Sequence, residues 1–480
     1  MSRSRLKLLS RSETKDIHDA SLQILENPGL RIPSKRALDI LKMAGANVDY
    51  EKNRATIPED IVREALRRAP KTLKYCARNP KNNLLLNKKE TYFTTDAYSV
   101  FIRDSKTGQR RSSTNEDLAQ WAILSDYLPQ IHDIWTSMVP NDIPESMQRI
   151  VAILTCLDNS EKHVEGMALS AREAQYEIEI AAAIVGDRET LKKKPIFSAI
   201  QCPIAPLGYE KGLIEGVIEF AKAGIPVVPL AMPLAGETGP VTIAGTLVVN
   251  NAEVLGSIVI SEFANPGAPV LYAGDPSGID LMTGAFVISP EGVLINSALT
   301  SLAHYYGLPS LITGGCSDSK IPDAQAAYER TLGLVTTLLT GPDIICGLGG
   351  LEGANVMCPE LLLIDNEIVE EALRIARGFE VDDATLAVDV IRGVGPGGHF
   401  LSQKHTVDHL KNEYWIPKIS NRDPYETWIK KGAKDIVQIA KEKIEEILSR
   451  HKPDPIPLDI RQEISQIIKK CESEFLKRKH

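Results

Sequence analysis

IFSAIQ at positions 196–201 is a short apolar run that predicts a buried strand, and a helical pattern over 208–223 follows it. Gly224-Ile225-Pro226 then ends this helix and begins a second apolar run, IPVVPLA, at 225–231. A glycine at the end of a helix and a proline ahead of the next strand are typical of a helix-to-strand connection. The segment therefore predicts two parallel strands joined by a crossover helix.

The same unit recurs along the chain, at intervals of roughly 30 to 43 residues that suit a strand, a loop and a crossover helix. The predicted strands lie at 92–97, 134–139, 163–168, 196–201, 225–231, 270–274, 310–314 and 344–347. Helical patterns follow them at 115–127, 142–157, 171–186, 208–223, 239–264, 290–306, 323–340 and 359–379. Eight such pairs predict an α/β fold, the (β/α)8 or TIM barrel. A doubly wound sheet is the alternative, but the GxGxxG turn usual after its first strand is missing here.

Helical patterns also flank the predicted barrel. Ser10-Arg11-Ser12-Glu13 resembles a capping box ahead of an amphipathic helix, and two more helices are expected before residue 70. Beyond 380 come a glycine-rich turn, a polar aromatic segment and two charged helices at about 432–450 and 460–477. We expect three parts: an N-terminal helical region at 1–90, a catalytic barrel at 91–380 and a C-terminal cap or helical extension at 381–480.

Composition excludes several classes of protein. With 55 Lys and Arg against 63 Asp and Glu, the formal net charge is -8, so no basic excess exists to bind nucleic acid. The sequence has no secretory-signal pattern and no run of the roughly 20 apolar residues that a membrane helix needs. Its seven cysteines are scattered and form no CxxC pair, as in reduced cytosol. We therefore expect a cytoplasmic enzyme without a membrane or nucleic-acid partner.

Reactive groups of a barrel gather where its strands end, because the βα loops there form the active site. Charged and polar candidates at those positions are Asp96, Tyr98, Glu165, Gln201, Glu237, Tyr272, Asp275, Asp318 and Lys320. Two of them also have plain structural interpretations: Glu165 as a paired carboxylate inside an apolar strand, and Asp318 as a turn residue.

Other candidates are weaker. Cys316 has no histidine in the adjacent βα loops to activate it, so a structural role is favoured. The glycines at 347–350 would suit a phosphate, but the acidic Glu352 beside them disfavours one. His399, His405 and His409 are the densest histidine group, yet an irregular turn interrupts their spacing, so we expect no metal site.

Three blocks together carry a resemblance to a known family. They are DSKTGQRR at 104–111 with Thr114 and Asp117, GCSDSK at 315–320 with Asp323, Gln325 and Glu329, and GGHFL at 397–401 with His405-Thr406 and Glu413-Tyr414-Trp415. Over nearly its whole length the chain resembles the trimethylamine methyltransferases, which are corrinoid-dependent. Members that act on trimethylamine are known for a pyrrolysine in the barrel. This sequence has only standard residues, so it is similar to the branch that demethylates quaternary amines such as glycine betaine.

The resemblance implies a partner: a separate corrinoid protein, whose cobalamin in the Co(I) state accepts the methyl group. A methyl on a quaternary nitrogen leaves a neutral tertiary amine behind, so the leaving group needs no proton and no Lewis acid such as zinc. The enzyme would supply positioning and electrostatics for an in-line displacement. We expect a homo-oligomer.

Roles for the candidates follow from this chemistry. The expected catalytic carboxylates are Glu165, Asp96 and Glu237, which add negative potential around the cation. The expected substrate-binding residues are Tyr98, Tyr272, Gln201, Asp318, Lys320 and His399. Tyr98 and Tyr272, with Trp135 and Phe197 as further aromatic candidates, would hold a trimethylammonium group by cation–π attraction of roughly 0.5–2 kcal/mol each. His399, Lys320 or Gln201 would donate to a substrate carboxylate.

Two functions of other classes remain as alternatives. A barrel lyase or isomerase would use Glu165 and Lys320 for acid–base chemistry and would need no cobalamin protein. A non-catalytic betaine-binding protein would bind the ligand without transferring a methyl group.

Overall fold

The computed structural model describes residues 6–477, and its centre is a closed barrel of eight parallel strands. Around the barrel the strand order is β10-β11-β12-β14-β17-β18-β6-β9, so each strand pairs with its neighbours along the chain and the last pairs with the first. The strands are β6 (Tyr92–Thr95), β9 (Asp133–Trp135), β10 (His163–Gly166), β11 (Phe197–Gln201), β12 (Val227–Ala231), β14 (Tyr272–Gly274), β17 (Ser310–Thr313) and β18 (Ile344–Leu348). The predicted (β/α)8 barrel and its eight strands are confirmed.

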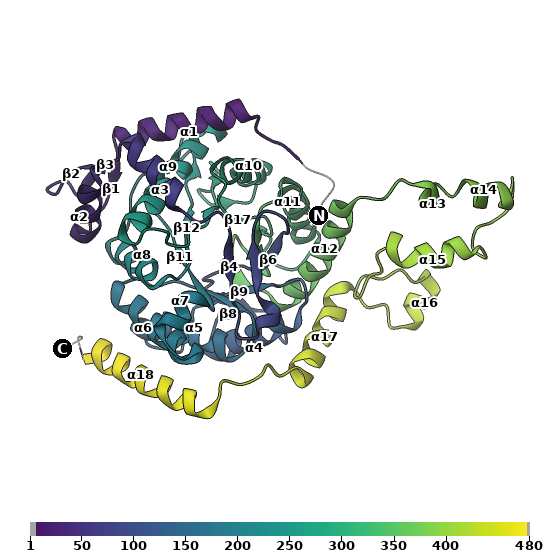
Figure 1. Cartoon of the computed structure of the whole chain (residues 1–480). Coiled ribbons are helices and arrows are strands. Elements are labelled where there is room, and N and C mark those ends of the chain that lie inside the picture. Colours follow the sequence, from purple (N-terminus) through teal and green to yellow (C-terminus); the bar gives the residue numbers. More distant parts are fainter. Residues whose placement is uncertain (1–5, 478–480) are drawn as a thin grey trace.

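Helices surround the strands (Figure 1). They are α4 (Asn115–Tyr127), α5 (Gln148–Asp158), α6 (Ala171–Val185), α7 (Arg188–Lys193), α8 (Lys211–Ala223), α9 (Ile243–Ala264), α10 (Pro290–Tyr306), α11 (Ala324–Thr340) and α12 (Pro359–Arg377). Left-handed glycines end three of them, at Gly224, Gly307 and Gly341, and the first of these is the helix end that Gly224-Ile225-Pro226 predicted.

Alternate residues of each strand belong to two separate cores. Ile200, Leu230, Leu271 and Leu311 face the barrel interior, together with Trp135, Val228, Ala273, Ile344 and Cys346. Their neighbours in the chain face outward and pack under the helices, as Phe197, Ala199, Tyr272 and Ile312 do. This two-residue period decides which side chain of each strand end can reach a ligand inside the barrel.

A β-hairpin of β4 (Leu73–Tyr75) and β5 (Leu84–Leu86) contributes to the interior core and fills the amino-terminal end of the barrel. Before it lie α1 (Arg11–Glu26), α2 (Lys35–Ala44) and α3 (Glu59–Arg68), with a small sheet of β1 (Leu30–Arg31), β2 (Asn47–Asp49) and β3 (Arg54–Thr56). The capping box at Ser10 and Glu13 is present. Sequence patterns missed these short strands.

Helix α9 is long and apolar enough to cross a membrane by length and composition, but 72% of its most apolar window is buried. It packs between the barrel and the N-terminal helices α1, α2 and α3, which covers its apolar surface. Its apolar character is thus that of a core helix.

Two small sheets follow the carboxyl ends of the barrel strands. One consists of β7 (Phe101–Arg103), β8 (Arg110–Ser112), β19 (Gly350–Leu351) and β20 (Val356–Met357). The other consists of β13 (Leu234–Ala235), β15 (Ser277–Ile279) and β16 (Phe286–Val287). Because they extend β6, β18, β12 and β14, these sheets lie at the rim of the barrel mouth.

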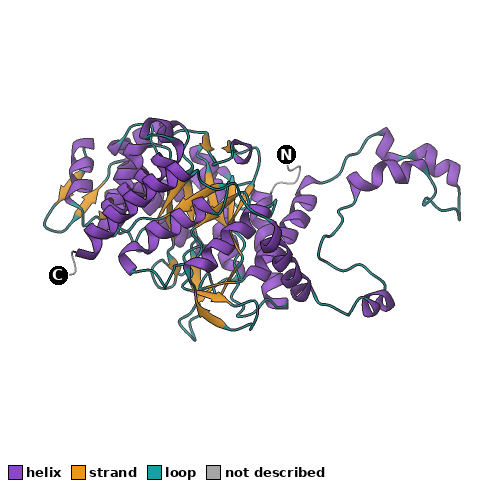
Figure 2. Ribbon diagram, turned by 90° about the horizontal axis from the view of Figure 1, so that it is seen from below, coloured by secondary structure: helices purple, strands orange, loops and turns teal. Residues whose placement is uncertain are grey.

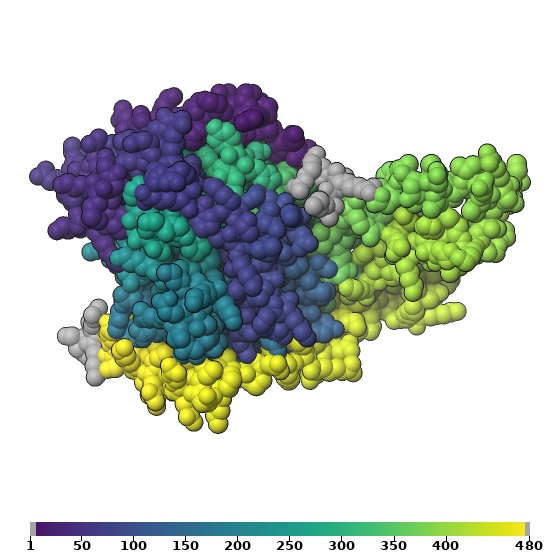
Figure 3. Space-filling model, viewed as in Figure 1, coloured from purple at the N-terminus to yellow at the C-terminus, as the bar shows by residue number. Residues whose placement is uncertain are grey.

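The C-terminal part of the chain consists of two segments, a projecting arm and two helices that pack on the barrel domain. A long arm leaves α12 and carries α13 (Asp383–Leu386), α14 (Val388–Val394), α15 (Lys404–Glu413) and α16 (Tyr425–Lys430) well away from the barrel (Figures 1 and 2). The chain then returns as α17 (Ile436–Arg450) against α12 and α4, and as α18 (Leu458–Lys477) against α6. In the space-filling view, the arm projects from the body while the last helix lies along one side of it (Figure 3).

Candidate functional site

Two carboxylates meet at the carboxyl ends of the barrel strands. Asp96 directly follows β6 and Asp275 directly follows β14, at the end of a barrel where active sites form. Burial raises the pKa of Asp96 to about 6, and burial with the nearby charge of Asp96 raises the pKa of Asp275 to about 8. Among the described residues, the buried Oδ1 of Asp275 has no hydrogen-bond partner. The mouth therefore contains two acidic groups whose ionisation is disfavoured by burial, a pattern typical of functional sites.

Gly347 within β18 and Gly350 at the start of β19 let the backbone close around these groups. A Cβ atom on Gly350 would lie 2.1 Å from Oδ2 of Asp96, and one on Gly347 would lie 2.8 Å from Sγ of Cys316. The thiol of Cys316 in turn donates to Asp96 at 3.9 Å, and burial raises its pKa well above the usual value. The glycines thus pack against Asp96 and Cys316, and the thiol is held protonated, as its structural interpretation requires.

A second polar group lies beside the first and comes mostly from helices. Arg149 near the start of α5 places its guanidinium carbon 5.2 Å from the centre of the Tyr98 ring. Glu177 of α6 is fully buried, and burial raises its pKa well above the usual range. Within residues 6–477, the hydroxyl of Tyr98, Nη1 of Arg149 and both carboxyl oxygens of Glu177 are buried without a hydrogen-bond partner. Buried polar atoms left unpaired in this way are typical of a binding site.

Glu165 lies deeper in the barrel. Its Oε1 accepts hydrogen bonds from Tyr75 of the hairpin and from Ser198 of β11, both at 3.1 Å. Burial raises the pKa of Glu165, and burial together with the charge of Glu165 raises the pKa of Asp133 well above its usual value. These contacts favour the structural interpretation of Glu165 over a catalytic one, because its partners belong to the closed end of the barrel.

Tyr272 and Gln201 lie outside the barrel interior. The hydroxyl of Tyr272 donates to Asn251 of α9 at 2.9 Å, and Gln201 accepts from Ser257 of the same helix at 2.8 Å. Both occupy outward positions of their strands, so the structure corrects their expected place in the substrate cage. Phe197 also faces outward, against Phe220 of α8.

Four other candidates lie at the surface or in loop contacts. Glu237 is exposed in the turn after β13. Asp318 accepts the backbone N–H of Ile288 at 2.7 Å and so fixes a loop, while exposed Lys320 donates to the carbonyl of Asp318 at 2.6 Å. His399 is exposed in the segment between α14 and α15, and these two helices lie on the arm, away from the barrel (Figure 1). The structure brings none of the four to Asp96 and Asp275.

Arg149 and Glu177 were not among the site residues predicted from the sequence, because those candidates came from strand ends and βα loops, whereas these two lie in helices. A signal did exist for Glu177, which shares the buried face of α6 with Ala174, Ile178 and Ala181 at helical spacing, and Arg149 stands at the start of the apolar run IVAILTCL of α5. In an amphipathic helix, a charged residue on the buried face needs a partner or a ligand.

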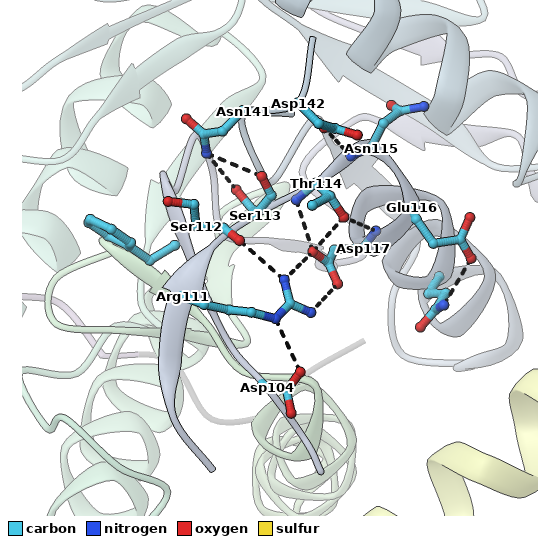
Figure 4. Close-up of polar contacts among 12 residues, drawn as sticks. Asp104, Arg111, Ser112, Ser113, Thr114, Asn115, Glu116, Asp117, Asn141 and Asp142 are labelled. Atoms are coloured by element: carbon cyan, nitrogen blue, oxygen red, sulfur yellow. Dashed lines mark hydrogen bonds and ion pairs between the residues drawn. The ribbon is translucent and has the colours of Figure 1, made fainter. Parts of the chain in front are cut away.

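The motif blocks that carry the resemblance have structural contacts. Figure 4 shows Arg111 of β8 bound to both carboxyl oxygens of Asp117 at 2.7 Å and to Asp104 at 3.1 Å. Asp117 also caps α4 through Thr114, so this block fastens the rim sheet to a barrel helix. In the second block, Glu329 accepts from Ser317 at 2.7 Å and holds the loop after β17.

In the part of the chain that the structure describes, no group of three or more His, Cys, Asp or Glu side chains is arranged to hold a metal ion. In the third block, the rings of His405 and His409 stack with centroids 4.2 Å apart on the exposed arm.

A closed (β/α)8 barrel with charged side chains at the carboxyl ends of its strands is the architecture of a barrel enzyme. Residues 2–475 match the family described as trimethylamine methyltransferase (MTTB). The chain is 38% identical to the trimethylamine methyltransferase MttB of Desulfitobacterium hafniense, over 96% of this chain and 92% of that protein. It is 33% identical to a glycine betaine methyltransferase from the same species, over 96% of each chain. The protein therefore belongs to the trimethylamine methyltransferase family and is a methyltransferase.

A solved structure supports the fold alone. The monomethylamine methyltransferase MtmB of Methanosarcina barkeri is 13% identical and superposes with a TM-score of 0.50, over 91% of this chain and 92% of that one.

Proposed function

We propose that this enzyme moves a methyl group from a quaternary amine, glycine betaine or a related betaine, to Co(I) of cobalamin carried by a separate corrinoid protein. The named relatives include a glycine betaine methyltransferase and several trimethylamine methyltransferases, and the corrinoid acceptor is implied by the family. A quaternary nitrogen departs as a neutral amine, so the protein has to bind, orient and desolvate the cation and nothing more.

The observation that carries the proposal is the acidic pair at the mouth. Asp96 is buried and Asp275 is half-buried with its Oδ1 enclosed, and neither forms an ion pair within 4.0 Å with a described residue. Carboxyl groups taken out of water without a cation in contact are unfavourable in the free protein, and a quaternary ammonium supplies the missing charge. Tyr98 adds an aromatic face at the same opening.

Several features then follow for the reaction. The substrate methyl would point out of the barrel along its axis, because the β4–β5 hairpin closes the other end. The docked corrinoid protein would cover the mouth and exclude water. In this proposal residues 91–380 form the catalytic domain, with 1–90 and 381–480 as flanking parts. We place the reaction in the cytoplasm, since Co(I) needs a reducing compartment and all seven cysteines are free thiols.

We also propose that the arm binds a second copy of this chain. Its base is fixed to α12, where Arg374 donates to the carbonyl of Glu413, but α13 to α16 bury no residue in their own chain. Helices this short are marginal without a packing partner. The arm exposes Phe379, Val381, Leu386, Val388, Ile391, Phe400, Leu401, Val407, Leu410, Tyr414, Ile416, Tyr425 and Ile429.

A second copy suits this surface better than the corrinoid protein. The arm projects sideways from the ring of helices, whereas a methyl acceptor has to approach along the barrel axis and leave after each reaction (Figure 1). Tyr328 and Leu332, one turn apart on α11, are 62% and 52% exposed and offer an apolar face for the arm of another copy.

The proposed reaction is tested by mixing the enzyme with a reduced corrinoid protein and glycine betaine and following the cobalamin spectrum. We expect the Co(I) band to decay only when enzyme and amine are both present. Persistence of Co(I) with glycine betaine, choline and tetramethylammonium alike would refute the proposal. Turnover of a betaine in the absence of any corrinoid protein would instead indicate lyase or isomerase chemistry.

A further inference from the structure

The barrel mouth also contains a positively charged side chain, Arg149. Methyl transfer from a quaternary ammonium ion that carries no carboxylate does not need such a group. Arg149 reaches the mouth from the first turn of α5, and its Nη1 is buried with no acceptor among residues 6–477. The Tyr98 ring faces this guanidinium, but a cation–π contact does not replace the hydrogen bond that the nitrogen loses when it leaves water. This cost implies that a bound anion completes the site.

Tyr98 adds a second unpaired donor at the same place. Its backbone is left-handed, with φ of 54°, which a tyrosine adopts only at some cost in strain. This conformation turns the ring to face Arg149, 5.2 Å from the guanidinium carbon. The tyrosine hydroxyl is buried and has no acceptor within the described chain. A planar guanidinium beside a hydroxyl donor matches a carboxylate, which accepts several hydrogen bonds in one plane.

Glu177 lies near this group but forms no ion pair with it. Burial and, to a smaller extent, the neighbouring Glu173 raise the pKa of Glu177 well above its usual range, and Arg149 lowers it in part. Both of its carboxyl oxygens are buried with no hydrogen-bond partner among residues 6–477, and no ion pair within 4.0 Å joins Glu177 to Arg149, so the guanidinium stays available to a ligand.

The positive and negative groups are close together. Cys202 directly follows β11 and lies near both charges. Burial raises the pKa of its thiol most, Asp275 raises it further, and Arg149 lowers it. The thiol belongs to the barrel-interior core, as Tyr98 does. Tyr98, which faces Arg149, also follows Asp96 by two residues, so the positive and the negative groups lie at the same end of the barrel.

We infer that Arg149 and Tyr98 bind the carboxylate of the substrate while Asp275 and Asp96 face its ammonium group, so that this enzyme acts on carboxylated quaternary amines and discriminates against uncharged-tail analogues such as choline. The inference rests on the proposed function and names the substrate class of that same site. Choline would leave Arg149 unpaired, and sites built to bind a missing polar group reject such analogues strongly, here by roughly 100-fold or more in kcat/KM.

Calorimetric binding of glycine betaine and of tetramethylammonium to the full-length enzyme tests the inference without cobalamin. Arg149→Gln is expected to weaken glycine betaine binding by about 100-fold and tetramethylammonium binding by less than about threefold. Arg149→Lys keeps the charge but not the planar guanidinium, so its affinity for glycine betaine should lie between those of the wild type and Arg149→Gln. An intermediate affinity also shows that the site stays folded. Arg188→Gln, at an exposed position on α7, is the matched control and should change neither.

Two outcomes overturn the inference: equal losses for both ligands in Arg149→Gln, or a wild-type enzyme that binds choline as tightly as glycine betaine. Failure of the proposed function is a separate result. Tight, Arg149-dependent betaine binding without methyl transfer to the corrinoid protein would refute the reaction and leave the carboxylate site standing.

Discussion

Oδ2 of Asp365 lies 2.6 Å from Nη1 of Arg330 and 2.6 Å from the backbone nitrogen of Gly349, in a position where both side chains are fully buried. The guanidinium of Arg330 also donates to the carbonyl oxygens of Gly315 and Gly347. One ion pair thus joins the ends of β17 and β18 behind Asp96, and the charge of Arg330 partly offsets the rise in the pKa of Asp96 that burial causes.

Breaking this pair should destabilise the fold. Arg330→Met leaves the carboxylate of Asp365 buried and unpaired, so we expect the free energy of unfolding in urea to fall by about 3–5 kcal/mol. Arg188→Met, at an exposed helix position, should change it by less than about 0.5 kcal/mol. Similar values for the two variants would mean that the pair does not hold the loops together.

Cation binding should depend on pH through Asp275 and Asp96. A carboxyl is neutral below its pKa, so protons compete with the cation below about 8 for Asp275 and below about 6 for Asp96. Tetramethylammonium does not titrate, and its Kd should weaken by about 100-fold from pH 9 to pH 6. Calorimetry measures this directly, and a Kd that stays constant over that range would contradict a carboxylate site.

Asp275→Asn should separate stability from function. The pKa of Asp275 rises from its usual 3.8 to about 8 on folding, so its contribution to stability is complete below pH 4 and is lost as pH rises through 8. Asparagine does not ionise, and the variant should melt several degrees higher than the wild type at pH 9 while losing tetramethylammonium binding. At pH 4 the two melting temperatures should converge. Unchanged binding in this variant would remove Asp275 from the site.

The arm should control the number of subunits. Ile391→Glu with Leu401→Glu places two charges on its apolar surface, and light scattering should report a lower mass than for the wild type. Met43→Glu, a residue 81% exposed on α2, is the control and should keep the wild-type mass. A monomeric wild type, or an oligomer that survives the double substitution, would show that the arm has another role.

The sequence predicted the barrel well because its signal is local. Each strand is an apolar run of about five residues, and glycine and proline mark the loops that precede several of them. The side of the strand on which a residue lies is harder to predict. A shift of one residue along the strand moves a side chain from the barrel interior to the outer face, under the helices. Tyr272 and Gln201 were assigned to the substrate on proximity to a strand end, and each occupies an outward position.

The rest of the site depends on tertiary packing. Arg149 and Glu177 reach the mouth from helices, and only the distance to Tyr98 and the lack of partners reveal them. His399 belongs to a motif that carries the family resemblance, yet it lies between α14 and α15, two helices of the arm, and no local pattern in the sequence indicates that the arm leaves the barrel.

The central claim, that the methyl group passes from a quaternary nitrogen to cobalt, is tested most directly with glycine betaine whose three N-methyl groups carry deuterium. The enzyme, reduced corrinoid protein and labelled substrate are incubated, and both products are measured by mass spectrometry. We predict one trideuteromethyl group on cobalamin for each dimethylglycine formed. Dimethylglycine without labelled cobalamin, or neither product, would contradict the account.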